Sequence, residues 1–511
     1  MQAGFKALAE RYGIELAQPL RVESVIGTTR VSRESNGQVE NKYPASYEPA
    51  DDFAGHFEFG LKYEEIHLEF FARLFAATGP EPIAAWCRQA PFGQYARRTG
   101  FLYEWLTGQR LDVPDVTNGG YVDAVSSQQY LTRVEPVRVR RWRINDNLPG
   151  VPAFCPLVRR TEAVQQALQF DLDAALRELN QTFGADILMR TASWLTFKES
   201  RASFLIEKEA DKADRIQRFA HVIAKYCGHI DDPLSNDSLQ TLQAGILGHE
   251  AVGLGLRRSP VFVGQATMRE DIVHYIAPPF EELPRLIDGL KAFEVATRGG
   301  EPLARAATLA FAFVYIHPMR DGNGRIHRFL INDTLIRDKA VPDGVILPVS
   351  ATITSSIDFR ARYDRTLEVF SRPFMQRYAA SYRFGELVTY EDGTQSNLVF
   401  DDYADAQVAW RYPDLTEHVL YTAQVVAHTV RTEMADEARV LVVFQRAQER
   451  LKEVLEMPDQ DANRIIRSLK ENGWQISGKL RKTYPQLDNA QRAERVVEAV
   501  RSAFEEREAG G

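Results

Sequence analysis

The chain of 511 residues has only three cysteines, Cys87, Cys155 and Cys227, and they lie far apart in the sequence. This spacing excludes a disulfide framework and a cysteine-rich metal site. Cys227 and His229 together offer only two metal ligands, too few for a site, so we expect buried core side chains there. The low cysteine content predicts a reducing, cytoplasmic location.

Long apolar runs are also missing. No run reaches the roughly 20 apolar residues that cross a bilayer, and the N-terminus lacks the apolar core of a signal peptide. We therefore expect no membrane as a partner.

The chain has no excess of positive charge either. It carries 62 Lys and Arg residues against 70 Asp and Glu residues, for a net charge of -8. This balance argues against a protein that coats nucleic acid over its whole surface. The hydrophobic content of 44% and charged content of 26% are those of an ordinary globular protein. The length predicts two or three domains.

What the sequence does contain is a dense polar stretch over residues 316–328, which reads IHPMRDGNGRIHR. The segments on either side, residues 301–316 and 326–338, have the apolar spacing of buried helices. The stretch therefore predicts a helix, a polar loop and a second helix.

Each residue type in this loop suits the binding and cleavage of a polyphosphate. Gly322 and Gly324 can adopt positive φ and turn backbone N–H groups inward, and Asn323 adds an amide donor. The turn leads into a helix N-terminus, which favours an anion. Arg325 and Arg328 are three residues apart on one helix face, so both can reach the same phosphate chain.

Two further side chains suggest chemistry. Asp321 is suited to hold Mg²⁺ against phosphate oxygens, and His317 is placed to take a proton from an attacking hydroxyl. The structural alternative is a helix-capping turn with His317 as a core histidine.

The stretch resembles the signature of the Fic family, His-Pro-Phe-x-(Asp/Glu)-Gly-Asn-Gly-Arg-x-x-Arg, with Met319 in place of the phenylalanine. The resemblance covers roughly residues 192–373 and implies a mainly α fold, with a helical core and a β-hairpin flap. It also implies a nucleotidyltransferase that moves AMP from ATP to a Ser, Thr or Tyr hydroxyl of a target protein. His317 would then be the catalytic base, and Asp321 would bind Mg²⁺. Gly322, Asn323, Gly324, Arg325 and Arg328 would bind the nucleotide.

A second motif precedes this core. Fic proteins often carry an inhibitory helix that reads (Ser/Thr)-x-x-x-Glu-(Gly/Asn), and Ser203 and Glu207 fit it, with Lys208 in place of the small residue. The two residues are four apart and share a helix face. The resemblance implies that Glu207 pairs with Arg328 and prevents productive docking of the ATP γ-phosphate. The alternative is a solvated glutamate.

The expected flap begins with Val261, Phe262, Val263 and Gly264, followed by a second apolar run at residues 273–279. In the family this hairpin sits beside the active site and aligns the target peptide through main-chain hydrogen bonds. Pairing of that kind is independent of the peptide's sequence.

The flanks of the core are predicted as separate domains. We expect a mostly helical N-terminal domain at residues 1–190, the catalytic core at 191–373 and a helical C-terminal domain at 374–511. In the N-terminal domain, residues 31–52 read as loop and residues 137–144 as a strand with one basic face. Near the C-terminus, two short helices joined through Gly473 resemble a helix-turn-helix, which keeps a nucleic-acid partner open.

Several alternatives remain open. A Fic relative that phosphorylates its target lacks the sequence Gly322-Asn323-Gly324, so this chain departs from it. Relatives with an inhibitory glutamate also remove AMP, which keeps a de-AMPylase or a bifunctional enzyme open. A nucleotide-sensing transcriptional regulator is a third alternative. Self-modification and a homo-oligomer also stay open.

Overall fold

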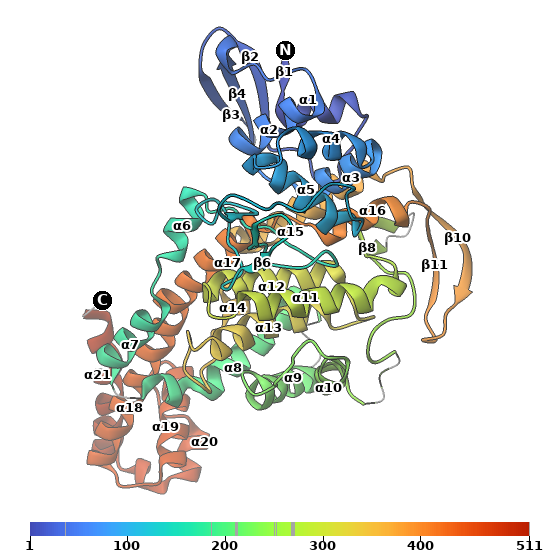
Figure 1. Cartoon of the computed structure of the whole chain (residues 1–511). Coiled ribbons are helices and arrows are strands. Elements are labelled where there is room, and N and C mark those ends of the chain that lie inside the picture. Colours follow the sequence, from blue (N-terminus) through green and yellow to red (C-terminus); the bar gives the residue numbers. More distant parts are fainter. Residues whose placement is uncertain are drawn as a thin grey trace.

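The computed structural model describes residues 1–35, 37–184, 186–209, 213–249, 251, 253–266 and 271–509, with backbone only at 265, 266, 271 and 506–509. Helices make up 58% of the chain and the sheets are small, which confirms the predicted mainly α fold. The N-terminal elements lie at one end of the molecule in Figure 1, and the last helices lie at the other end.

The N-terminal part combines a four-stranded sheet, in the order β1-β2-β4-β3, with helices whose buried apolar residues form a core of their own. Its elements are β1 (Gln2–Ala3), α1 (Gly4–Arg11), β2 (Val22–Gly27), β3 (Val31–Ser35), β4 (Gln38–Pro44), α2 (Phe53–Tyr63), α3 (Leu68–Thr78), α4 (Glu81–Gln89) and α5 (Gln94–Thr107). The prediction of a loop over residues 31–52 is therefore wrong. Strand β3 is exposed along its whole length, so it shows no alternation of apolar residues that a sequence pattern could reveal.

A three-stranded sheet, ordered β5-β7-β6, follows. Its strands are β5 (Val122–Asp123), β6 (Val137–Val139) and β7 (Ile144–Asp146). The single strand predicted for residues 137–144 is wrong, because the basic segment turns back on itself and β6 pairs with β7 antiparallel. The left-handed backbone of Arg143, with φ of 49°, lies in that turn.

The central part carries the predicted signature and consists mainly of helices. Its elements are α6 (Glu162–Leu168), α7 (Leu172–Phe183), α8 (Ile187–Ile206), α9 (Ala213–Tyr226), α10 (Asn236–Leu247), β8 (Phe262–Ala266), β9 (Asp271–Ile276), α11 (Leu283–Thr297), α12 (Pro302–Ile316), α13 (Asn323–Arg337), α14 (Val349–Ser355) and α15 (Ile357–Arg377).

The C-terminal part begins with a β-hairpin that projects from the side of the molecule in Figure 1. Its elements are β10 (Tyr382–Thr389), β11 (Gln395–Phe400), α16 (Tyr403–Arg411), α17 (Thr416–His428), a π-helical turn (Thr429–Met434), α18 (Ala435–Val454), α19 (Asp459–Glu471), α20 (Gly478–Thr483) and α21 (Ala490–Ala509). The predicted pair of short helices corresponds to α19 and α20. Lys479 and Lys482 on α20 are exposed, and a role for them in nucleic-acid binding stays a prediction.

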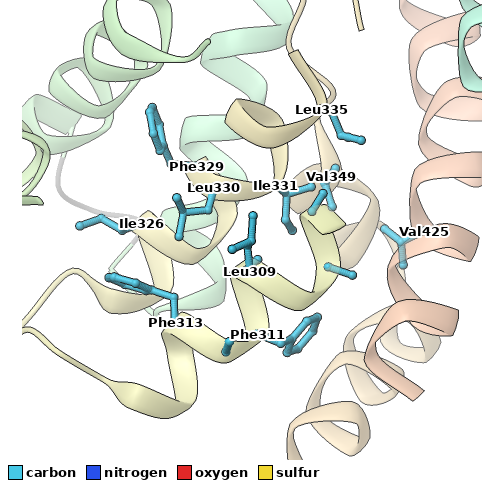
Figure 2. Close-up of a cluster of buried hydrophobic side chains, with 14 of the residues drawn as sticks. Leu309, Phe311, Phe313, Ile326, Phe329, Leu330, Ile331, Leu335, Val349 and Val425 are labelled. Carbon is cyan, nitrogen blue, oxygen red and sulfur yellow. The ribbon is translucent and has the colours of Figure 1, made fainter. Parts of the chain in front are cut away.

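The central core forms around α12 and α13, which flank the signature loop. Nearly every residue of α12 is buried, because the helix is apolar on all sides. Figure 2 shows Leu309, Phe311 and Phe313 of α12 beside Ile326, Leu330 and Ile331 of α13, with Val425 of α17 at the edge of the cluster. This packing holds the two ends of the loop in fixed positions.

Buried apolar residues form three main clusters, one in the N-terminal part, one in the centre and one among α18–α21. The domain limits predicted at residues 190 and 373 both fall inside helices, α8 and α15. As limits of folding units, the three predicted ranges stay a prediction. In the described part of the chain, no helix combines the length and apolar character that crossing a membrane requires.

Candidate functional site

The signature loop begins where α12 ends, at His317. This residue caps the helix with a left-handed backbone, φ of 48° and ψ of 55°, and its N–H donates to the carbonyl of Phe313 at 2.9 Å. A left-handed conformation costs a residue with a Cβ about 1–2 kcal/mol. The surrounding contacts therefore hold His317 in a conformation that it would not adopt alone.

The ring of His317 has one nitrogen engaged. Its Nδ1 lies 3.2 Å from the carbonyl oxygen of Val314, which can only accept, so Nδ1 carries the proton and Nε2 keeps a free lone pair. Burial, together with the charge of Arg257, lowers the pKa of His317 to about 4. The imidazole is thus neutral at pH 7, the state that a proton acceptor needs.

The next residues form the turn into α13. Gly322 has φ of 94° and stands at the N-cap of α13, where no side chain caps the helix. The side-chain amide of Asn323 closes the loop on Met319, accepting from its N–H at 3.0 Å and donating to its carbonyl at 2.7 Å. The amide predicted as a phosphate donor is therefore used within the loop. Met319 is fully buried in the core.

The two signature arginines emerge from the first turns of α13 and are both bound by carboxylates. Arg325 donates from Nη1 to Glu209 at 2.6 Å and from Nη2 to Asp321 at 2.5 Å. Arg328 is fully buried and donates from Nη2 to Glu207 at 2.6 Å. Each cation predicted to hold a phosphate is thus paired with an anion of the chain itself.

Ser203 and Glu207 do contact Arg328 together, which confirms the predicted pairing of Glu207 with this arginine. The hydroxyl of Ser203, on α8, accepts from Nε of Arg328 at 2.7 Å. Burial alone would raise the pKa of Glu207, but the guanidinium groups of Arg328 and Arg325 outweigh it, and the pKa lies below its ordinary value. Glu207 is therefore ionised.

The carboxylate of Glu207 also covers the N-terminus of α13. A methyl group added to Gly324 would overlap its Oε1 atom. Unpaired N–H groups at a helix N-terminus attract anions, so the carboxylate lies where the sequence predicts bound phosphate.

The backbone conformation at Lys208 favours glycine or asparagine, the residues with which the related motif usually ends. The backbone of Lys208 is left-handed, with φ of 59°. Glycine and asparagine adopt that conformation readily, whereas it destabilises a lysine by about 1–2 kcal/mol. The geometry of the motif is kept at this cost.

Contacts on two sides hold α8, the helix that presents Ser203. Glu199, fully buried, accepts from the N–H and hydroxyl of Ser350 at 2.7 and 2.6 Å. On the outward side Lys198 donates to Glu433 and Glu437 at 2.9 and 2.7 Å. The helix that carries Ser203 is thus attached both to the core and to the C-terminal helices.

The predicted flap is a hairpin. Strand β8 includes Phe262, Val263 and Gly264 and pairs antiparallel with β9, and Val261 accepts from the N–H of Ala277 just before it. The hydroxyl of Tyr275, on β9, donates to the carbonyl of Tyr315 at 2.6 Å. The hairpin is therefore attached to α12 two residues before His317.

Three residues of the site were not predicted from the sequence. Glu209 binds Arg325, Gln243 donates to the carbonyl of Asp321 at 2.8 Å, and Arg257 donates to the carbonyl of His317 at 2.8 Å. A second acidic residue two positions after Glu207 was the only visible signal. Gln243 and Arg257 lie far from the motif in the sequence and carry no pattern of their own.

Asp321, the predicted metal ligand, is half exposed and binds Gly322 N–H and Arg325 through the same oxygen. Within the described residues, no group of three or more His, Cys, Asp or Glu side chains is placed to hold a metal ion. A single carboxylate still suits Mg²⁺ that is held mainly by substrate phosphates and water.

The segment that contains this geometry also matches a known family. Residues 233–335 match the family model described as the Fic/DOC family. This part of the chain is a Fic domain. It includes the flap, α12, the signature loop and most of α13.

Two curated relatives match part of the chain. The chain is 32% identical over 165 residues to a protein adenylyltransferase fic-1 of Caenorhabditis briggsae, and 31% identical over 167 residues to that of Caenorhabditis elegans. In both cases the alignment covers 31% of this chain and 29% of the relative. The chain thus spans less than a third of the length of these relatives.

A solved structure of a Fic family protein from Desulfovibrio desulfuricans G20 is also similar. The comparison covers 56% of this chain and 79% of that one, at 18% identity and a TM-score of 0.38.

Proposed function

We propose that this chain is a protein adenylyltransferase, which transfers AMP from ATP to a Ser, Thr or Tyr hydroxyl of a protein. The observation that carries the proposal is the position of a neutral imidazole at one end of a short loop and two arginines at the other. Between them lies the N-terminus of α13, where the N-cap residue, Gly322, supplies no capping side chain. The similarity to protein adenylyltransferases supports it.

The reaction is an in-line substitution at phosphorus. Nε2 of His317 takes the proton of the target hydroxyl, and the hydroxyl oxygen forms a bond to the α-phosphorus of ATP. The bond from that phosphorus to the bridging oxygen breaks, and pyrophosphate leaves. Arg325 and Arg328 stabilise the negative charge that moves onto the leaving group.

Mg²⁺ is the metal expected for this chemistry. Asp321 would hold it together with phosphate oxygens, and the ion would neutralise part of the charge of the nucleotide. For Asp321 to do so, its carboxylate must exchange Arg325 for the metal. Release from Asp321 would leave Nη2 of Arg325 for the outer phosphates, while Nη1 stays paired with Glu209 until that carboxylate moves too.

The contacts with both arginines support an inhibited resting state. Glu207 binds Arg328 and covers Gly324, while Glu209 binds Arg325. Since the γ-phosphate of ATP would compete with these carboxylates for the same cations, ATP binds productively only when the segment after α8 moves. Ser203 supports this inhibition, because its hydroxyl accepts from Nε of Arg328 and so orients Nη2 towards the carboxylate of Glu207.

For the target protein, we propose that the flap segment from Val261 to Gly264 aligns an extended segment beside His317. Val263 is exposed on this strand, and a two-stranded hairpin has unpaired edges that can accept another strand.

Removal of AMP is a second candidate activity. An ionised Glu207 next to Gly324 could orient a water molecule. The water oxygen would form a bond to the phosphorus of the attached AMP, the bond from that phosphorus to the side-chain oxygen would break, and AMP and the free hydroxyl would be released. Incubation of an AMP-modified target with wild-type protein and with Glu207→Gly separates the two activities. Loss of AMP with the wild-type protein alone would support removal.

A nucleotide-sensing regulator that binds DNA is the remaining alternative, based on exposed Lys479 and Lys482. A gel-shift assay of the full chain with and without ATP tests it. Retention of DNA binding after both lysines are changed to glutamine would exclude the predicted helix pair as the binding element.

The protonation state of His317 should make the rate of transfer almost independent of pH between 6 and 8. His317 must be neutral to accept a proton, and its pKa of about 4 keeps it neutral throughout that range. We expect kcat/KM to fall only when the pH drops towards 4. A pH profile of transfer that loses activity with a midpoint near 6.5, the ordinary histidine value, would contradict the assigned environment of His317.

Arg328→Ala should weaken ATP binding about 10- to 150-fold, the effect of losing a charge-assisted hydrogen bond of about 1.5–3 kcal/mol. The measurement belongs in the Glu207→Gly background, where Arg328 is not already paired and no carboxylate is left unpaired. Isothermal titration with ATP gives the affinity. Arg337→Ala, on the same helix but bound to Glu294 and the carbonyls of Ile230 and Asp231, is the control and should leave ATP affinity unchanged.

A further inference from the structure

Arg257 lies at the point where the signature loop meets both ends of the flap. It precedes β8 by five residues and is fully buried. Its guanidinium donates to three main-chain carbonyls, those of His317 at 2.8 Å, Ser259 at 2.9 Å and Pro278 at 2.6 Å. One side chain therefore connects the candidate base to the segment before β8 and to the segment after β9.

The backbone of the same residue adds a fourth contact. The N–H of Arg257 donates to the carbonyl of Pro318 at 2.9 Å, and Leu256 forms a bridge with Met319. Residues 256–257 thus run alongside residues 317–319. The side chain and backbone of Arg257 together hold two consecutive carbonyls of the signature loop.

The environment of this arginine is unusual for a buried cation. All three acceptors of its guanidinium are neutral carbonyl oxygens, while Glu281 and Asp392 act on it only through their charge, alongside Tyr275 and Tyr403. Burial lowers the pKa of Arg257 to about 10. Burial of a cation without a directly bonded anion is unfavourable. A hydrophobic residue in this space would therefore destabilise the fold less.

The contact of Arg257 with the carbonyl of His317 constrains the backbone of His317. The direction of the His317 carbonyl depends on the ψ angle of that residue, which is 55° in the strained left-handed region. A donor fixed on this oxygen opposes rotation back to an ordinary helical or extended backbone. The ring is held separately by the contact of Nδ1 with Val314.

We propose that Arg257 is a positioning residue that holds the left-handed backbone of His317 and the two ends of the flap in one fixed arrangement. A target segment paired with the flap is thereby placed at a constant distance from Nε2. The role in positioning a target rests on the proposed transfer reaction, whereas the role in holding His317 does not.

Two substitutions separate the geometry of Arg257 from its charge. Arg257→Lys keeps a cation but cannot reach three carbonyls, and Arg257→Met removes both the donors and the charge at similar volume. Arg305→Met is the control for the loss of a buried arginine far from the signature loop. Arg305 donates to the carbonyl of Glu294 at 2.8 Å, is paired with the carboxylates of Asp338 and Glu294, and lies at the opposite end of α12 from His317.

The first readout is the His317 ring itself, observed by NMR in protein with labelled histidines and assigned by its loss in His317→Ala. The charged groups that act on this ring are Arg257 and Glu207. We expect Arg257→Met to raise the pKa of His317 from about 4 towards the ordinary value, and Arg257→Lys to shift the ring signals while the pKa stays low. Arg305→Met should change neither. Unchanged ring signals in Arg257→Lys would overturn the proposal, even if Arg257→Met fails to fold.

The second readout is transfer in the Glu207→Gly background. We expect Arg257→Lys to lower kcat about 10- to 100-fold, the effect of a displaced reacting group, with the KM for ATP unchanged. An equal loss of ATP affinity would indicate general damage to the loop and contradict a positioning role. If the parent Glu207→Gly protein transfers no AMP, the proposed function fails, and the NMR result still decides the role of Arg257 at His317.

Discussion

His317→Ala is expected to lower the rate of AMP transfer about 10²–10⁴-fold, the usual contribution of a positioned general base. His317 offers a neutral imidazole nitrogen, Nε2, at the start of the loop, because its Nδ1 is already engaged by Val314. ATP affinity should change little, because the nucleotide is assigned to the turn and to the arginines. The initial rate of transfer, measured at saturating ATP, gives the effect.

The fold should survive this change. Alanine in the left-handed conformation costs about the same as histidine, so the thermal unfolding temperature should shift little. His229→Ala is the control, because His229 is exposed and paired with Asp343 at 3.3 Å, outside the loop. Full activity in His317→Ala would refute the assigned base.

Glu207→Gly should raise the rate of transfer about 10- to 100-fold, which corresponds to about 1.4–2.8 kcal/mol of released inhibition. The change removes the carboxylate that binds Arg328 and covers Gly324. The remaining contact of Glu209 with Arg325 predicts that Glu207→Gly/Glu209→Gln is more active than Glu207→Gly alone. Rates at several ATP concentrations would show the gain mainly as tighter productive binding.

Lys208→Gly is the matched control for this experiment. It relieves the left-handed backbone at φ of 59° but leaves Glu207 in place. We expect no activation, because a relaxed turn holds the carboxylate at least as well. Activation by Lys208→Gly equal to that by Glu207→Gly would show that mobility of the segment, and not the carboxylate, sets the rate.

The local part of the site could be predicted from the sequence. The loop between α12 and α13 is continuous in the chain, so the order of His317, Asp321, Gly322 and the two arginines already determines which side chains can converge. The pairing of Glu207 with Arg328 was also predicted, through a motif that places Ser203 and Glu207 one helix turn apart, whereas the contact of Ser203 with Arg328 was not.

The parts that depend on distant segments could not be predicted. Arg257 and Gln243 reach the loop from elements outside the motif, and no local pattern marks them. The use of the Asn323 amide within the loop follows from how the loop closes on Met319, which the residue types alone do not determine.

The errors in the N-terminal part have the same origin. Strand β4 pairs with both β2 and β3, and the polar residues of β3 and β4, exposed throughout β3, look like a loop when read alone. The basic segment from Val137 to Ile144 contains a tight turn between β6 and β7. The alternation of arginines does not reveal this turn, because it fits one continuous strand as well as two paired strands.

The most direct test of the account is the intact mass of the Glu207→Gly protein after incubation with ATP and Mg²⁺, with Glu207→Gly/His317→Ala alongside. We expect a gain equal to one or more AMP units in Glu207→Gly, a smaller gain in the wild-type protein and none in the double variant. A gain equal to phosphate would contradict it, because the nucleotide would then bind in the reverse direction. An AMP gain that persists without His317 would contradict the assigned chemistry.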